Sequence, residues 1–140
     1  MTGSSASGSR RAEITSPRAT VAVVTAGAIP YYIERHSIDL LGKTDPFVAR
    51  LPMRRAPGWA GVTGYYPGHL KWDYRYSIGE LKPDVVAQLW GDPREAAPYL
   101  DRRYVGVTAV FNRQVKTLYL RRASPNIHWQ KVGGLQISPR

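Results

Sequence analysis

Residues 20–46, TVAVVTAGAIPYYIERHSIDLLGKTDP, contain two short apolar runs that predict the first two strands of the fold. The first run, residues 20–24, is β-branched at four of its five positions and carries no charge, as in a strand buried on both faces. The second run, residues 37–41, contains Asp39 as its only ionisable group. Residues 44–46, TDP, then supply capping side chains and a proline suited to the first turn of a helix. The stretch therefore predicts the start of a small α/β layer.

The rest of the chain predicts further short helices and strands around this start. Helical spacing or helix-start residues mark three segments: 45–51, 69–81 and 92–100. Apolar or alternating runs mark three more strands, 83–90, 103–111 and 115–122, of which the last two form a hairpin. Because strands and helices alternate, the strands at Val21, Ile38 and Val85 are expected to lie side by side and parallel. The predicted fold class is α/β, with a small mixed, mainly parallel sheet, flanking short helices and a C-terminal β-hairpin.

The predicted domain organisation is one folded unit between two less ordered ends. A chain of 140 residues with 43% hydrophobic residues suits a single domain with its own core. Residues 1–18 are small and polar and are predicted to be a disordered N-terminal segment. Residues 19–122 form the predicted α/β domain, and residues 123–140, rich in glycine and proline, form a C-terminal tail that is partly ordered at best.

The composition restricts the chemistry of the chain. A net charge of +10 favours anionic partners, namely nucleic acid, an anionic lipid surface or phosphorylated substrates. The chain has no cysteine, and its three histidines are too far apart in sequence to suggest a metal site. Nucleotide-binding glycine motifs and the hydrolase nucleophile motif are absent, so no cofactor is predicted. Without an apolar span or a signal peptide, the chain as written is expected to be soluble.

Asp39 is the first candidate site residue. It ends a predicted strand, at the edge of an α/β sheet where ligands usually bind. A structural role is the alternative, in which the carboxylate binds neighbouring backbone amides or pairs with Arg35. A single acid offers no partner for acid–base catalysis, so only binding is predicted here.

The second candidate is the group His69, Lys71 and Asp73 in the sequence GHLKWDY. A histidine and a lysine at a helix start can together hold a phosphate, aided by the helix dipole. In the structural alternative, His69 caps or packs, Lys71 is solvated and Asp73 pairs with a neighbouring cation such as Arg75.

Aromatic side chains form the third candidate. Tyr31 and Tyr32 lie between the first two strands and are predicted to line a sugar- or lipid-facing groove, together with Trp59, Tyr65 and Tyr66. The alternative is that these large side chains fill the core.

The C-terminal hairpin carries the strongest concentration of positive charge. Its cations are Arg102, Arg103, Arg113, Lys116, Arg121 and Arg122. They suit a nucleic-acid or anionic-membrane face, although charged edge strands also protect a sheet against edge-to-edge pairing.

Four motifs carry a family resemblance. The order and spacing of AGAIPYY, IDLLGKTDP, GHLKWDY and LKPDVV, within about residues 20–120, resemble the C-terminal extracytoplasmic domain of bacterial polytopic glycosyltransferases. These membrane enzymes use polyprenyl-phosphate sugars and include arabinofuranosyl- and mannosyltransferase-like members. The resemblance implies a membrane-embedded catalytic portion elsewhere, and a location on the extracytoplasmic face, in the cell envelope, if this chain is part of such a parent.

Three functional hypotheses follow from these features. In the first, the chain is a non-catalytic accessory domain that positions a lipid-linked sugar or acceptor glycan, with Asp39, His69 and Lys71 on the polar groups. The alternative is a stand-alone basic module that binds nucleic acid through the hairpin and exposed aromatics. A third, a small enzyme with His69 as general base, has no residue in the sequence that would orient this histidine.

Overall fold

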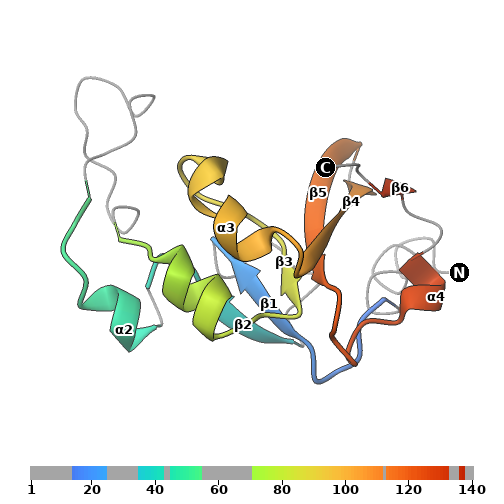
Figure 1. The fold of residues 1–140 in the computed structure, drawn as a ribbon, viewed down its shortest axis with the longest axis horizontal. Coiled ribbons are helices and arrows are strands. Elements are labelled where there is room, and N and C mark those ends of the chain that lie inside the picture. Colours follow the sequence, from blue (N-terminus) through green and yellow to red (C-terminus); the bar gives the residue numbers. More distant parts are fainter. Residues whose placement is uncertain are drawn as a thin grey trace, which may run out of the picture.

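The structure, a computed structural model, describes residues 14–24, 35–42, 45–54, 71–111, 113–132 and 136–137. These residues form one sheet, with short helices packed around it (Figure 1). The six strands are β1 (Thr20–Val23), β2 (His36–Asp39), β3 (Val85–Val86), β4 (Tyr104–Phe111), β5 (Gln114–Arg121) and β6 (Gln136–Ile137), in the spatial order β2-β1-β3-β5-β4-β6. The helices are α2 (Pro46–Ala49), the π-helix η3 (Arg75–Glu80), the 3-10 helix η4 (Pro93–Glu95), α3 (Ala97–Leu100) and α4 (Trp129–Val132).

The first half of the sheet is parallel. Strand β1 lies between β2 and β3, with Ala22 opposite Ile38 on one side and Val21 opposite Val85 on the other. The prediction that the strands at these three positions lie side by side and parallel is confirmed. The side chains at residues 21–23 of β1 and at Val85–Val86 of β3 are buried, as expected for central parallel strands, whereas the edge strand β2 begins with exposed His36 and Ser37.

The second half of the sheet is antiparallel, so the prediction of a mainly parallel sheet is wrong. Strand β5 pairs antiparallel with β3, β4 with β5, and β6 with β4, against two parallel pairings at β1. The predicted C-terminal hairpin is confirmed, with the register running from Tyr104 opposite Arg121 to Phe111 opposite Gln114. The two strands of the hairpin are joined by a tight turn and pair along all eight residues of each. The parallel strands are shorter, with four residues in β1 and β2 and two in β3.

Alternate side chains point to opposite faces of the sheet, and each face has its own core. One core gathers Val21, Val85 and Leu120 with the chain-end residues Ile14 and Ile127. The other core, under η3, η4 and α3, is formed by Ala22, Leu40, Trp72, Tyr74, Ile78, Val86, Leu100 and Tyr104. In Figure 1, α3 lies over the sheet near β3, while α4 follows the segment that is hydrogen-bonded to Ile14. The sheet is therefore the middle layer between two thin layers.

Both chain ends contribute to the packed unit, beyond the predicted limits of residues 19 and 122. Thr15 forms a bridge with Ile127, and the amide of Ser16 donates to the carbonyl of Asn126 at 2.8 Å. Ile14, Ile127 and Val132 are buried against the sheet. Residues 14–18 and the described part of the predicted tail cover a sheet face that would otherwise expose its valines and leucines to water.

The helices are shorter than their sequence patterns predict. Helix α2 starts where expected, because the Asp45 carboxylate accepts from the amides of Phe47 and Val48 at 2.8 and 3.1 Å, but it spans only Pro46–Ala49. The predicted helix 92–100 is divided into η4 and α3, since Pro98 has no amide hydrogen and fits only the first turn of a new helix. Of the predicted helix 69–81, the described part contains η3.

The predicted strand 83–90 pairs with its neighbours only at Val85–Val86. Beyond it, the amide of Trp90 donates to the hydroxyl of Tyr74 at 2.7 Å, and that hydroxyl donates in turn to the Trp90 carbonyl. The Tyr74 hydroxyl thus satisfies the backbone amide and carbonyl of Trp90, which a neighbouring strand would otherwise bind. Burial, the largest cause, raises the pKa of Tyr74 to about 12.

Candidate functional site

Asp39 lies at the carboxyl end of β2, as predicted, but its side chain is engaged locally. The residue is 3% exposed, and its carboxylate accepts a hydrogen bond from the amide of Leu41 at 2.9 Å. This bond stabilises the turn that leads to Gly42, whose φ of +74° is a left-handed conformation that favours glycine. The structural alternative for Asp39 therefore accounts for its geometry.

Lys71 and Asp73 are also held by local contacts. The Lys71 ammonium donates to the carbonyl of Ala49 at 2.6 Å, which ties it to α2. Asp73 accepts from the amide of Tyr76 at 3.2 Å and lies 3.7 Å from the guanidinium of Arg75, so it supports the start of η3. Lys71 therefore connects the segment before η3 to α2, and Asp73 connects it to the first turn of η3.

His69, Tyr31 and Tyr32 lie outside the described residues, as do the aromatic residues Trp59, Tyr65 and Tyr66.

A pocket of about 400 Å³ opens at the base of the β4–β5 hairpin. Its lining, called the basic pocket below, consists of Ile78, Lys82, Arg102, Arg103, Tyr104, Arg121, Arg122 and Ala123. Three chain segments supply these residues: the end of η3 and the turn after it, the turn between α3 and β4, and the end of β5 with the turn that follows. Cations from distant parts of the sequence are thus brought to one place.

Hydrogen bonds hold the three segments together. The buried hydroxyl of Tyr104 donates to the carbonyl of Pro83 at 2.7 Å, and the amide of Arg122 donates to the carbonyl of Arg103 at 2.8 Å. Burial raises the pKa of Tyr104, so its phenol stays protonated and keeps this bond. The walls of the pocket are consequently fixed by the fold.

The positive charge of Arg121 is compensated by the buried carboxylate of Asp84. The Asp84 carboxylate is buried and accepts from Arg121 Nη2 at 2.8 Å, and also from Thr20, Ser124 and Asn126. Burial alone would raise the pKa of Asp84, but the hydrogen bonds from Ser124, Thr20, Arg121 and Asn126 outweigh it and lower the pKa below 3.8. Arg121 Nε is buried and has no hydrogen-bond partner within the described part of the chain.

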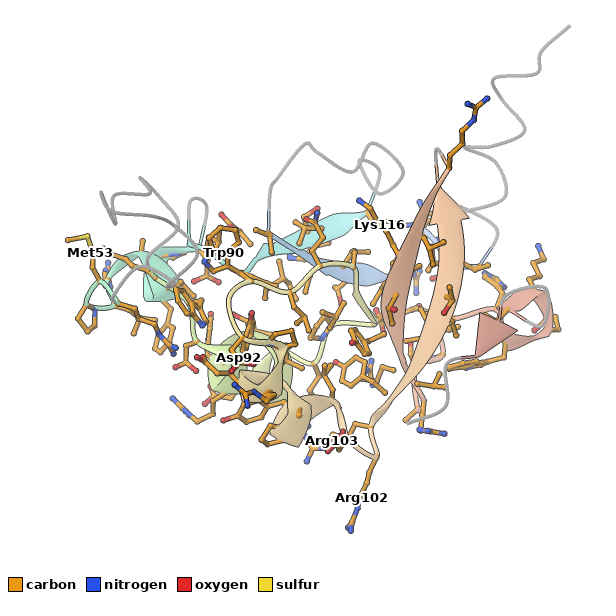
Figure 2. All side chains as sticks on the ribbon, turned by 90° about the horizontal axis from the view of Figure 1, so that it is seen from above. Met53, Trp90, Asp92, Arg102, Arg103 and Lys116 are labelled. Carbon is orange, nitrogen blue, oxygen red and sulfur yellow. The ribbon has the colours of Figure 1, made fainter. Side chains whose placement is uncertain are left out.

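Among the described residues, the remaining cations of the basic pocket have no acidic partner. Lys82, Arg102, Arg103 and Arg122 are exposed and form no ion pair with any described residue. Elsewhere on the surface, by contrast, several arginines each lie within 4 Å of a carboxylate, namely Arg54, Arg75 and Arg94. Figure 2 shows Arg102 projecting outward from the end of the hairpin, with Arg103 close to it. The pocket is therefore a local concentration of positive charge that no acid in the described part of the chain compensates.

Two of these cations have an unfavourable backbone conformation. Lys82 has a φ of 48° and Arg102 a φ of 67°. For a residue with a Cβ, this left-handed region costs about 1 kcal/mol or more. The third such residue in the described part, Arg113, occupies the tight turn between β4 and β5.

The cations predicted to cluster on the hairpin separate into different groups. Arg102, Arg103, Arg121 and Arg122 line the basic pocket at its base. Lys116 is an odd number of residues from Arg121 along β5, so it points to the opposite face of the sheet, the face of Leu118 and Leu120. Figure 2 places Lys116 away from Arg102 and Arg103.

Lys82 and Tyr104 are pocket residues that the sequence did not indicate. The sequence marks Lys82 only as a helix-end residue, because it follows the last turn of a helical pattern and precedes a proline. Nothing in the sequence relates it to Arg103 or Arg122, since tertiary packing alone brings these residues together.

Two further properties of the described residues bear on function. No helix among them is long and apolar enough to cross a membrane. The same residues contain no group of three or more histidine, cysteine, aspartate or glutamate side chains placed to hold a metal ion.

The chain belongs to the family described as "Domain of unknown function (DUF8728)", which matches residues 7–133. No curated protein and no solved structure matches the chain significantly. The family match extends over the two chain-end segments that complete the core, in agreement with one packed unit.

Proposed function

We propose that this member of the DUF8728 family is a non-catalytic module that positions a phosphate-bearing ligand. The observation that carries the proposal is the basic pocket, in which four cations that pair with no acid of the described residues border a cavity of about 400 Å³. The resemblance to extracytoplasmic domains of membrane glycosyltransferases favours a lipid-linked sugar as this ligand, positioned for a membrane-embedded transferase portion.

The chemistry of the lining suits a phosphate group. Guanidinium groups donate paired, charge-assisted hydrogen bonds to phosphate oxygens, and an ammonium group adds a compact charge. The volume lies within the usual range of about 300–1,000 Å³ for small-molecule sites. It leaves room for part of the group attached to the phosphate, against the apolar surface of Ile78 and Tyr104.

The lining contains no histidine, aspartate or glutamate, the side chains that most often transfer protons in catalysis. Its ionisable side chains are arginines, Lys82 and Tyr104, and burial raises the pKa of Tyr104. Asp84, behind the pocket, has a lowered pKa and accepts from several donors, so it is a poor general base. These properties support binding and orientation of a ligand in preference to bond cleavage.

Binding of a polyprenyl-phosphate sugar in mixed micelles tests this proposal. Arg103→Ala and Arg122→Ala should each weaken binding about tenfold, because each removes a charge-assisted contact. Lys131→Ala is the matched control, since this exposed cation lies on α4, which packs on the other side of the sheet. Equal affinity of all three variants and the unmodified chain would rule out this site.

Nucleic acid is a second candidate ligand, favoured by the +10 net charge and by the additional cations Arg113 and Lys116 on the hairpin. A salt titration with single-stranded oligonucleotide distinguishes it. If several cations of the chain contact the phosphates of a single strand, the logarithm of the binding constant should fall linearly with the logarithm of the salt concentration. The slope is about −0.7 for each phosphate contacted. A shallow slope would disfavour this function.

A further inference from the structure

We infer that the cations around the basic pocket dock the chain on the surface of an anionic lipid bilayer. The docking face, as it is called below, consists of the exposed residues Leu81, Lys82, Arg102, Arg103 and Arg122. The inference rests on the proposed function for the purpose of docking, which is to bring the pocket to the phosphate of a lipid-linked sugar at the bilayer surface.

Two cations of the docking face lie directly opposite each other at the base of the hairpin. The strand register places Tyr104 opposite Arg121, and one step beyond this pair the amide of Arg122 donates to the carbonyl of Arg103 at 2.8 Å. Like charges opposite each other on an antiparallel pair are destabilising. Lys82 borders the same cavity from a third chain segment and adds to the repulsion. An anionic surface that covers these side chains would relieve it.

The acids closest in sequence do not neutralise the docking face. Glu80 pairs with Arg75, and Asp84 pairs with Arg121. Asp101 precedes Arg102 in the chain but is not among the lining residues of the pocket. Even if Asp101 is counted in full, four cations and one acid leave the face with a charge of +3. Because each basic residue near an anionic bilayer strengthens binding about fivefold, this charge suits such a surface.

The side chains of the docking face favour a bilayer over single-stranded nucleic acid. Leu81 is 38% exposed and directly precedes Lys82 in the turn after η3. Protein segments that lie on membranes combine cations with such apolar side chains, which enter the boundary between headgroups and acyl chains. Tyr104, the one aromatic residue among the described lining residues, is 3% exposed, so bases would have no ring on which to stack.

The backbone of Lys82 and Arg102 supports a binding role for their side chains. Both residues have a left-handed conformation, with φ of 48° and 67°, which glycine would adopt without strain. Strain of this kind persists most often at functional sites. Lys82→Gly should therefore melt at a higher temperature than the unmodified chain and yet bind anionic vesicles less well. Weaker binding of this variant would not arise from unfolding.

Co-sedimentation of the full chain with lipid vesicles tests the inference. Vesicles of phosphatidylcholine with about one third phosphatidylglycerol should bind at least tenfold more tightly than vesicles of phosphatidylcholine alone in moderate salt. Arg103→Ala and Arg122→Ala should each weaken binding to the anionic vesicles about fivefold. Lys131→Ala, which removes an exposed cation of α4, is the matched control and should leave the binding unchanged.

Leu81→Ser tests the apolar part of the docking face. It should weaken binding to the anionic vesicles about fivefold, because the leucine no longer enters the bilayer. This ratio should persist as salt is raised, whereas the ratio for Arg122→Ala should fall towards one, since salt screens charges and not apolar contacts. Met53→Ser is the control, because Met53 is 72% exposed and lies far from Arg102 and Arg103 in Figure 2.

Failure of the docking inference is distinguishable from failure of the proposed function. Absence of vesicle binding, or equal binding to neutral and anionic vesicles, would overturn docking. The proposed function would stand alone if a polyprenyl-phosphate sugar in neutral detergent micelles still binds and this binding is weakened by Arg103→Ala. Vesicle binding that depends on Arg103 and Arg122, without binding of that ligand, would overturn the proposed function and retain docking.

Three further results would also contradict docking by this face. The first is tight binding of oligothymidine without vesicle binding, lost in Arg103→Ala and Arg122→Ala, which would assign the face to nucleic acid. The second is binding to anionic vesicles that is unchanged in both arginine variants, which would place the contact elsewhere on the molecule. The third is Lys82→Gly that keeps full vesicle binding.

Discussion

The carboxylate of Asp84 accepts a hydrogen bond from Arg121 at 2.8 Å, at the point where the sheet changes from parallel to antiparallel. Asp84 directly precedes β3, and Arg121 ends β5, the strand that pairs with β3. The same carboxylate binds Thr20 at the start of β1 and Ser124 in the C-terminal segment. One buried acid therefore connects the first strand, the hairpin and the chain end.

Replacement of this acid should be strongly destabilising. Asp84→Asn keeps the size of the side chain but removes the charge that compensates Arg121, and its amide cannot accept from every present donor. We expect a loss of about 3 kcal/mol in the free energy of unfolding, typical of a broken buried ion pair. Urea titration at pH 7 measures the loss. Glu80→Gln, at an exposed pair with Arg75, is the control and should change stability by less than about 1 kcal/mol.

The contribution of Asp84 should also depend on pH. Because the pKa of Asp84 is lower in the folded chain than its ordinary value of 3.8, the carboxylate stabilises the fold above that pH. The stabilisation is lost as the pH falls below 3.8 and through the lower, folded-state pKa. The stability difference between the unmodified chain and Asp84→Asn should therefore shrink below pH 4. Unfolding at several pH values between 2 and 7 measures this, and a constant difference would contradict the assignment.

Ser77 offers a prediction of the opposite sign. Its hydroxyl is buried in η3 and has no hydrogen-bond partner among the described residues. Ser77→Ala removes an unsatisfied polar group and should raise the free energy of unfolding by about 1 kcal/mol. Ser37→Ala, at an exposed position of β2, should leave stability unchanged. A loss of stability in Ser77→Ala would mean that the hydroxyl makes a bond that stabilises the fold.

Gly42 should tolerate no side chain. Its φ is +74°, and an added Cβ would lie 2.7 Å from the backbone nitrogen of Ala49. Strain and overlap with α2 together should make Gly42→Ala destabilising by about 2 to 3 kcal/mol. Gly79→Ala is a milder comparison, because its Cβ would meet the ring edge of Tyr99 at 3.1 Å, and thermal unfolding of both variants measures the difference. Equal losses would show that the backbone at Gly42 can move.

The local parts of this fold could be predicted from the sequence. The β-branched run of β1, the capping Asp45 and the alternating strands of the hairpin carry their signals within a few residues. The insertion of β5 beside β3 could not, because strand order depends on contacts across the whole chain. It is this arrangement that makes the sheet partly antiparallel.

The candidate site was less predictable for the same reason. Asp39 has the sequence position of a ligand-binding acid, yet it stabilises a turn, because a buried carboxylate must find amide donors. Lys82 and Arg122 lie in segments far apart in the sequence and meet only after packing. The division of the hairpin cations, in contrast, follows from the odd spacing of Lys116 and Arg121, which places them on opposite faces of a strand.

The most direct test of phosphate binding at the basic pocket is an NMR titration of the full chain with pyrophosphate, with backbone amide resonances followed through the titration. The largest shifts should fall on residues 82, 102–104 and 121–123, which border the pocket. Absence of shifts there, or shifts confined to residues 39–42 and 71–73, would contradict the basic pocket as the binding site.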